Sequence, residues 1–61
     1  MKLYAIRKQG KKENTSYIGL FADMGYKQIK ITFEDTLIAQ LLELSVKQLY
    51  EMPLDEKVYV K

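Results

Sequence analysis

The absence of both cysteine and histidine from a chain of 61 residues is the feature that most limits what it can fold into. A domain of this size buries only about 60% of the surface that its unfolded chain exposes, so small domains often depend on a disulfide, a metal or a partner. Without these two residue types, disulfides and the usual zinc ligands are excluded. We therefore predict one compact domain over residues 1–61, stabilised by its apolar core or by association.

The first half of the chain has the pattern of an antiparallel sheet. Residues 2–8 and 16–22 are predicted strands, because each is a short run rich in apolar and aromatic side chains and the polar segment 9–15 between them contains Gly and Asn. Residues 26–33 alternate apolar and polar side chains, which places Ile29, Ile31 and Phe33 on one predicted buried face. The Asp23-Met24-Gly25 segment fits a tight hairpin with Met24 exposed, and Gly19 indicates a close backbone approach or a bulge.

The second half changes to helical spacing. Residues 35–51 are rich in good helix formers and predict one helix, which Pro53 ends. Residues 57–61 predict a last short strand. The whole is an α+β domain of the β-β-β-α-β type, in which a four-stranded mixed sheet of order 3-2-1-4 carries the single helix on one face. A right-handed crossover would make the last strand parallel to the first.

A predicted core follows from these elements. It comprises the inward apolar positions of the strands and helix: Leu3, Ala5, Ile18, Leu20, Ile29, Ile31, Phe33, Leu37, Leu41, Leu49, Val58 and Val60.

The predicted helix has more apolar surface than its sheet requires. On a wheel of about 100° per residue its apolar arc covers well over half the circumference, whereas a helix on one sheet face needs a stripe of about 100° or somewhat more. One interpretation is a helix packed deeply into a curved sheet with a few exposed leucines. The other is a homodimer or partner interface formed by the surplus flank, Ala39, Leu42, Val46 and Tyr50, or by Leu37 and Leu44 if the helix is rotated.

Enzymatic chemistry is not indicated. The chain lacks the usual near-neutral proton shuttle, and its glycines do not form a phosphate-binding loop at a helix start. The adjacent pair Glu34-Asp35 is typical of a helix N-terminus rather than of a catalytic or metal site. We predict no catalytic residues, cofactor, metal or small-molecule substrate.

Charge is distributed unevenly along the chain. Residues 1–30 carry seven basic and two acidic side chains, whereas residues 31–61 carry three basic and six acidic ones, for a net charge of +2. Lysines and tyrosines alternate on the predicted strands, and an aromatic, cationic sheet face is able to stack bases and neutralise phosphates. A nucleic-acid interface is therefore one hypothesis, formed by Lys2, Tyr4, Lys8, Lys11, Lys12, Lys30, Lys57 and Tyr59.

The other hypothesis is a non-catalytic protein-binding or inhibitor-like module, homodimeric, that acts by occupying the surface of a partner protein. In size and composition the chain resembles the small single-domain proteins common in bacteriophage and bacterial genomes, some of which inhibit larger host machines; the resemblance implies an accessory protein. No stretch has the length and apolarity of a signal peptide core or a membrane span, which predicts a cytoplasmic protein without membrane contact.

Overall fold

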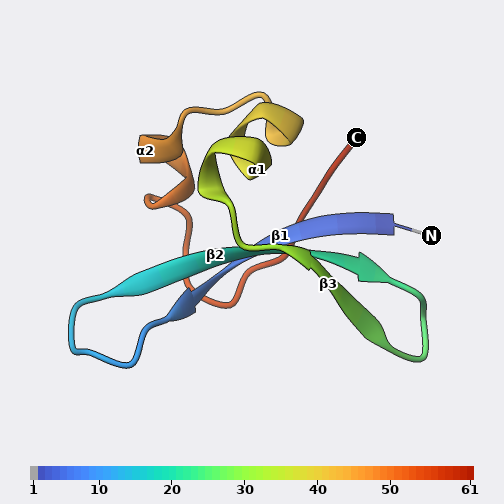
Figure 1. Ribbon diagram of the computed structural model, residues 1–61, viewed down its shortest axis with the longest axis horizontal. Helices are drawn as coiled ribbons and strands as arrows, with labels where there is room; N and C mark the ends of the chain where they lie inside the picture. Colours follow the sequence, from blue (N-terminus) through green and yellow to red (C-terminus); the bar gives the residue numbers. More distant parts are fainter. Residues whose placement is uncertain (1) are drawn as a thin grey trace.

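An antiparallel sheet with two short helices on one side makes up the fold (Figure 1). The computed structural model describes residues 2–61. Its elements in chain order are β1 (Lys2–Gln9), β2 (Ser16–Asp23), β3 (Gln28–Thr32), α1 (Asp35–Leu42), α2 (Val46–Leu49) and β4 (Val58–Tyr59). The α+β class and the three-stranded meander predicted from the sequence are confirmed.

The sheet order β3-β2-β1-β4 is also confirmed, but the predicted mixed sheet is wrong. Strand β4 runs antiparallel to β1, with Tyr59 opposite Tyr4. The reason lies at Arg7, near the far end of β1, where the returning chain is held. The Arg7 guanidinium donates to the carbonyl of Met52 (2.6 Å), and the amide of Asp55 donates to the Arg7 carbonyl (2.8 Å). A parallel β4 would instead have to begin at the Lys2 end of β1.

The single helix predicted over residues 35–51 is not confirmed, because the chain leaves helical geometry at Glu43. Glu43 has a left-handed backbone (φ 58°), and the amide of Leu44 donates to the carbonyl of Ala39 (2.9 Å). This is a Schellman-type helix end, usually formed with glycine. Ser45 then begins α2 with a capping box, in which its hydroxyl accepts from the Gln48 amide and the Gln48 side chain accepts from the Ser45 amide.

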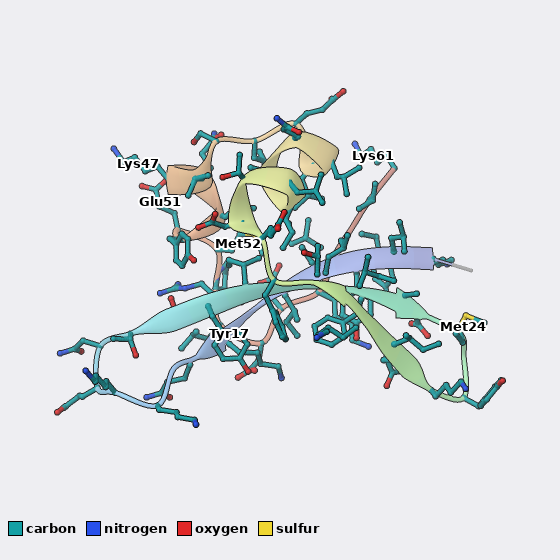
Figure 2. The ribbon with its side chains drawn as sticks, viewed as in Figure 1. Tyr17, Met24, Lys47, Glu51, Met52 and Lys61 are labelled. Atoms are coloured by element: carbon teal, nitrogen blue, oxygen red, sulfur yellow. The ribbon has the colours of Figure 1, made fainter. Side chains whose placement is uncertain are left out.

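The hydrophobic core lies between the helices and one face of the sheet. Strands β1 and β2 contribute Ala5, Ile18 and Leu20, and the helical segment contributes Ile38, Ala39, Leu49 and Met52. Figure 2 shows Met52 on the helix side of the sheet. The partly buried residues Leu3, Leu42, Leu44, Val46, Val58 and Val60 pack against this cluster. Neither helix in residues 2–61 is long and apolar enough to cross a membrane.

Part of the predicted core is wrong, and a bulge in β3 explains the exposure of Ile31 and Phe33. Leu20 pairs with Thr32 while Phe21 pairs with Lys30, so Ile31 is an extra residue in β3 that breaks the two-residue alternation. The short helices also leave the edge strand largely uncovered. As a result, five residues predicted to be buried are exposed: Ile29, Ile31, Phe33, Leu37 and Leu41.

Candidate binding surface on the open sheet face

The sheet face opposite the helices carries a different set of side chains, and we call it the open face. Strand pairing places alternate residues of each strand on it, and ring and lysine contacts add Phe33 and Lys57. Figure 2 shows Tyr17 on this side, away from the helices. The open face consists of Lys2, Tyr4, Ile6, Lys8, Tyr17, Gly19, Phe21, Asp23, Gln28, Lys30, Phe33, Lys57 and Tyr59.

Five aromatic rings form a continuous row across the open face. In spatial order the row is Tyr17, Phe33, Phe21, Tyr4 and Tyr59, with neighbouring ring centroids 5.7, 6.4, 5.6 and 5.6 Å apart. Tyr4 and Phe21 are stacked, and Tyr17 meets Phe33 edge to face. Such pairs contribute about 0.5–1.5 kcal/mol beyond the area they bury. The row therefore gives the sheet a second apolar layer without a helix over it.

The rings of the row differ in how far they are exposed. Tyr4 is only 4% exposed, whereas Tyr17, Phe33 and Tyr59 expose 44%, 51% and 43% of their surface. These three half-exposed rings supply apolar surface that a ligand can contact without any rearrangement of the sheet.

Three lysines lie over rings of the row. The distances from Nζ to the ring centroid are 5.8 Å for Lys2 over Tyr59, 5.0 Å for Lys30 over Phe33 and 4.8 Å for Lys57 over Tyr4. Each distance is within the range of a cation–π contact, which is worth about 0.5–1 kcal/mol at an exposed site. The one ion pair found in residues 2–61 joins Lys8 to Asp55, so these three ammonium groups are not neutralised by a carboxylate in direct contact.

Gly19 makes room for the row, and the groups that approach it are side-chain rings rather than the backbone that its isolation in an apolar strand predicted. A Cβ at this position would lie 2.7 Å from Cε1 of Phe21 and 2.9 Å from Cε1 of Phe33. Both distances are too short for a real contact, so the Phe33 ring depends on a residue without a side chain beneath it.

Acidic groups on and beside the open face are already engaged. One Asp23 oxygen accepts from the Gly25 amide (2.9 Å), and the other accepts from the Tyr59 hydroxyl (3.4 Å). The Gly25 hydrogen bond, with help from the charge of Lys57, holds the pKa of Asp23 below its usual 3.8. At the other end, the hydrogen bond and charge of Asp55, 2.9 Å from Lys8, raise the pKa of that lysine.

Six of the eight residues predicted for a nucleic-acid interface lie on this one face: Lys2, Tyr4, Lys8, Lys30, Lys57 and Tyr59. The other two, Lys11 and Lys12, lie exposed in the β1–β2 loop. The prediction omitted the three aromatic residues that complete the row. Tyr17 and Phe21 were detectable from their two-residue spacing around Gly19, whereas Phe33 was not, because the bulge reverses its face.

The four residues predicted for a dimer or partner interface range from buried to exposed. Ala39 is 4% exposed and belongs to the core, and Leu42 and Val46 are partly buried against it. Tyr50 is 36% exposed, and its hydroxyl donates to Asp35 (3.4 Å). Burial, and then the charge of Asp35, raise the pKa of Tyr50.

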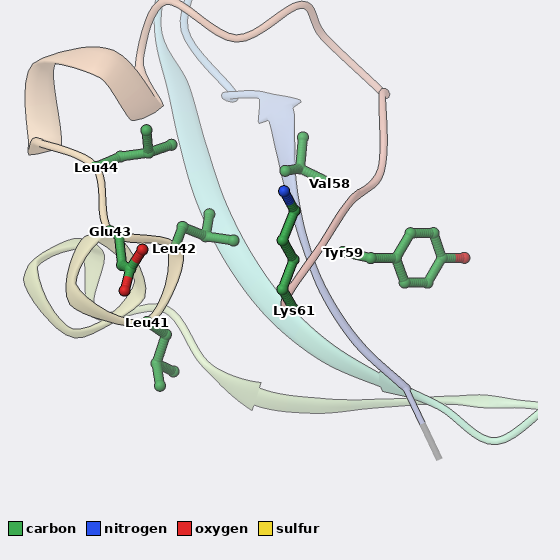
Figure 3. A pocket seen from close by; sticks show the side chains of 7 residues that line it. All are labelled: Leu41, Leu42, Glu43, Leu44, Val58, Tyr59 and Lys61. Carbon is green, nitrogen blue, oxygen red and sulfur yellow. The ribbon is translucent and has the colours of Figure 1, made fainter.

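A cavity of about 310 Å³ lies on the helix side, between the end of α1 and β4. Figure 3 shows Leu41, Leu42 and Leu44 on one side of it and Val58 and Lys61 on the other, with Tyr59 pointing away. Leucines and Val58 supply its apolar walls, and Glu43 and Lys61 are its charged residues. Within residues 2–61, no three acidic side chains gather in a way that would hold a metal ion.

Comparison with known proteins gives no matching family model, curated protein or solved structure. The functional interpretation therefore rests on the chemistry of the open face.

Proposed function

We propose that this chain is a non-catalytic binding module that acts by occupying the surface of a negatively charged macromolecule, with the open face as its binding surface. The observation that supports this most strongly is the placement of Lys2, Lys30 and Lys57 over an accessible aromatic row on a sheet face without a helix. The composition supports the absence of catalysis, since there is no histidine or cysteine to act as proton shuttle or nucleophile.

Charge determines the kind of ligand. The open face carries four lysines against one aspartate, and that aspartate is already hydrogen-bonded. A second copy stacked through the same face would bring lysines against lysines, and such like-charge contacts oppose association. A ligand with closely spaced negative charges would gain from every lysine.

Salt-dependent retention on a heparin column tests this proposal, with heparin serving as a generic polyanion. Lys2→Glu, Lys30→Glu and Lys57→Glu are combined in one variant. Lys27→Glu, Lys47→Glu and Lys61→Glu form the matched control, which changes net charge equally away from the row. The open-face variant is expected to elute at clearly lower salt than the control, provided that circular dichroism shows both to be folded. Elution of both variants at the same salt concentration would contradict the proposal.

A second candidate is the protein-binding, self-associating module. Aliphatic side chains that the fold leaves exposed favour it: Ile29 and Ile31 in β3 expose 42% and 50%, and Leu37 and Leu41 in α1 expose 42% and 43%. Apolar side chains of this kind are common at interfaces between copies of a small domain. If this surface forms a homodimer, sedimentation at micromolar concentration will show twice the chain mass, and Ile31→Asp with Leu37→Asp will restore the monomer. A wild-type protein that sediments as a monomer over that range would exclude it.

A further inference from the structure

The aromatic row narrows the choice of anionic ligand, because charge alone accounts only for the lysines. A carboxylate-rich protein surface would satisfy the ammonium groups and leave the half-exposed rings of Tyr17, Phe33 and Tyr59 without a matching partner. A flat, apolar ring face combined with a nearby cation is complementary to a nucleotide, which has a flat base and a phosphate.

The same rings also indicate whether a nucleic-acid ligand would be single-stranded or double-stranded. In a duplex each base is stacked on its neighbours and only its edges reach the grooves, so the protein rings would find phosphates but no base faces. Unpaired bases expose their faces, and stacking on aromatic side chains is the common way in which proteins bind them.

Spacing supports a ligand that extends across the sheet. The row has contributions from β1, β2, β4 and Phe33, which directly follows β3, and its rings follow one another at intervals of 5.6–6.4 Å. The lysine Nζ atoms lie only 4.8–5.8 Å from ring centroids, so a base stacked beside a ring has its phosphate within reach of the ammonium group of that ring.

We propose that the open face binds single-stranded nucleic acid, with bases stacked on Tyr17, Phe33 and Tyr59 and phosphates contacting Lys2, Lys30 and Lys57. This inference rests on the proposed function, since it names the anion that the open face receives. Recognition is independent of sequence, because every base has a face to stack and the row offers few polar groups to read base edges.

Fluorescence anisotropy with a labelled oligothymidylate of about 12 nucleotides tests the proposal directly. Tyr59→Ala is expected to weaken binding about 5-fold to 150-fold, the range measured for loss of one stacked base, while Tyr59→Phe retains it. Lys57→Ala should lower the slope of log affinity against log salt by about 0.7, as one phosphate contact on a single strand predicts.

Tyr26 provides the matched control. It is 84% exposed and has its own lysine, Lys27, 5.6 Å from its ring, but it lies in the β2–β3 turn outside the row. Tyr26→Ala should therefore leave binding unchanged. Equal weakening by Tyr26→Ala and Tyr59→Ala would overturn the stacking arrangement.

Competitors separate this inference from the proposed function. Duplex DNA and polyglutamate should compete much less well than unlabelled oligothymidylate at equal charge. If duplex DNA or polyglutamate competes equally well or better, the single-strand inference fails and the proposed function stands. The same holds if the protein is retained on the heparin column but does not bind the oligonucleotide. If neither heparin nor oligonucleotide binds at low salt, both fail.

Discussion

The two faces of the sheet come from the same strands and differ in what covers them. On the helix side, Ala5, Ile18 and Leu20 are at most 1% exposed because α1 and α2 lie over them. Residues 2–61 place no helix over the open face, and aromatic rings partly cover one another there. Because side chains alternate along a strand, one sequence specifies both faces. In our proposal the helix side serves folding and the open face serves binding.

Truncation of a core side chain should give the largest difference in stability between the two faces. Leu49 is fully buried, so Leu49→Ala is expected to lower the free energy of unfolding by about 2–5 kcal/mol, which a domain this small tolerates poorly. Tyr59→Ala removes a larger side chain that is 43% exposed, and it should cost less. Urea denaturation measures both. Equal losses would show that the open face contributes to stability as much as the core does.

Crowding the aromatic row should have the next largest effect. Gly19→Ala places a methyl group against Phe21 and Phe33, and overpacking of this kind costs about 1–3 kcal/mol. In a Phe33→Leu background the same substitution should cost less, because the obstructing ring is gone. A double-mutant cycle by denaturation gives the coupling. Additive losses would mean that the Phe33 ring does not lie over Gly19.

At the helix break, a substitution to glycine should have the opposite effect on stability from the same substitution inside α1. Glu43→Gly should raise the free energy of unfolding by about 1 kcal/mol, because glycine adopts the left-handed backbone of this residue without strain. Gln40→Gly, inside α1, should lower it by a similar amount. If Glu43→Gly were as destabilising as Gln40→Gly, residues 35–51 would form one continuous helix.

The smallest expected effect concerns pH at Asp23. Its folded-state pKa lies below 3.8, chiefly because of the Gly25 amide hydrogen bond, so its ionised form favours the folded state. That contribution is complete above about pH 4 and is lost as the pH falls through the lowered pKa. The difference in melting temperature between wild type and Asp23→Asn should therefore shrink between about pH 6 and pH 3. A difference that is constant over this range would contradict the role of Asp23.

Local patterns were sufficient to predict the three-stranded meander. The sheet order was also predicted, but from a parallel crossover to β1 that is wrong. Local patterns were insufficient where contacts between distant parts of the chain determine the structure. The direction of β4 depends on Arg7 holding Met52 and Asp55, a contact across 45 or more residues. The break between the helices did leave a local signal, because Ser45 and Gln48 have the spacing of a capping box within the apolar run.

The candidate site likewise was predictable in part from local patterns and in part was not. Strand alternation was enough to group six cationic and aromatic residues on one face, but the full row required the bulge at Ile31, which turns Phe33 away from Ile29. Assigning the apolar flank of the predicted helix to a partner assumed one straight helix. With the break after α1, Ala39 lies in the protein's own core, and Leu42 and Val46 pack against it.

Mapping of a bound oligothymidylate by NMR tests the difference between the faces most directly. On titration, the ring-proton resonances of Tyr17, Phe33 and Tyr59 are expected to shift together, while the methyl resonances of Ile38 and Leu49 are unchanged. Shifts confined to the helix side, or ring signals that do not move at saturating ligand, would contradict a binding role for the open face.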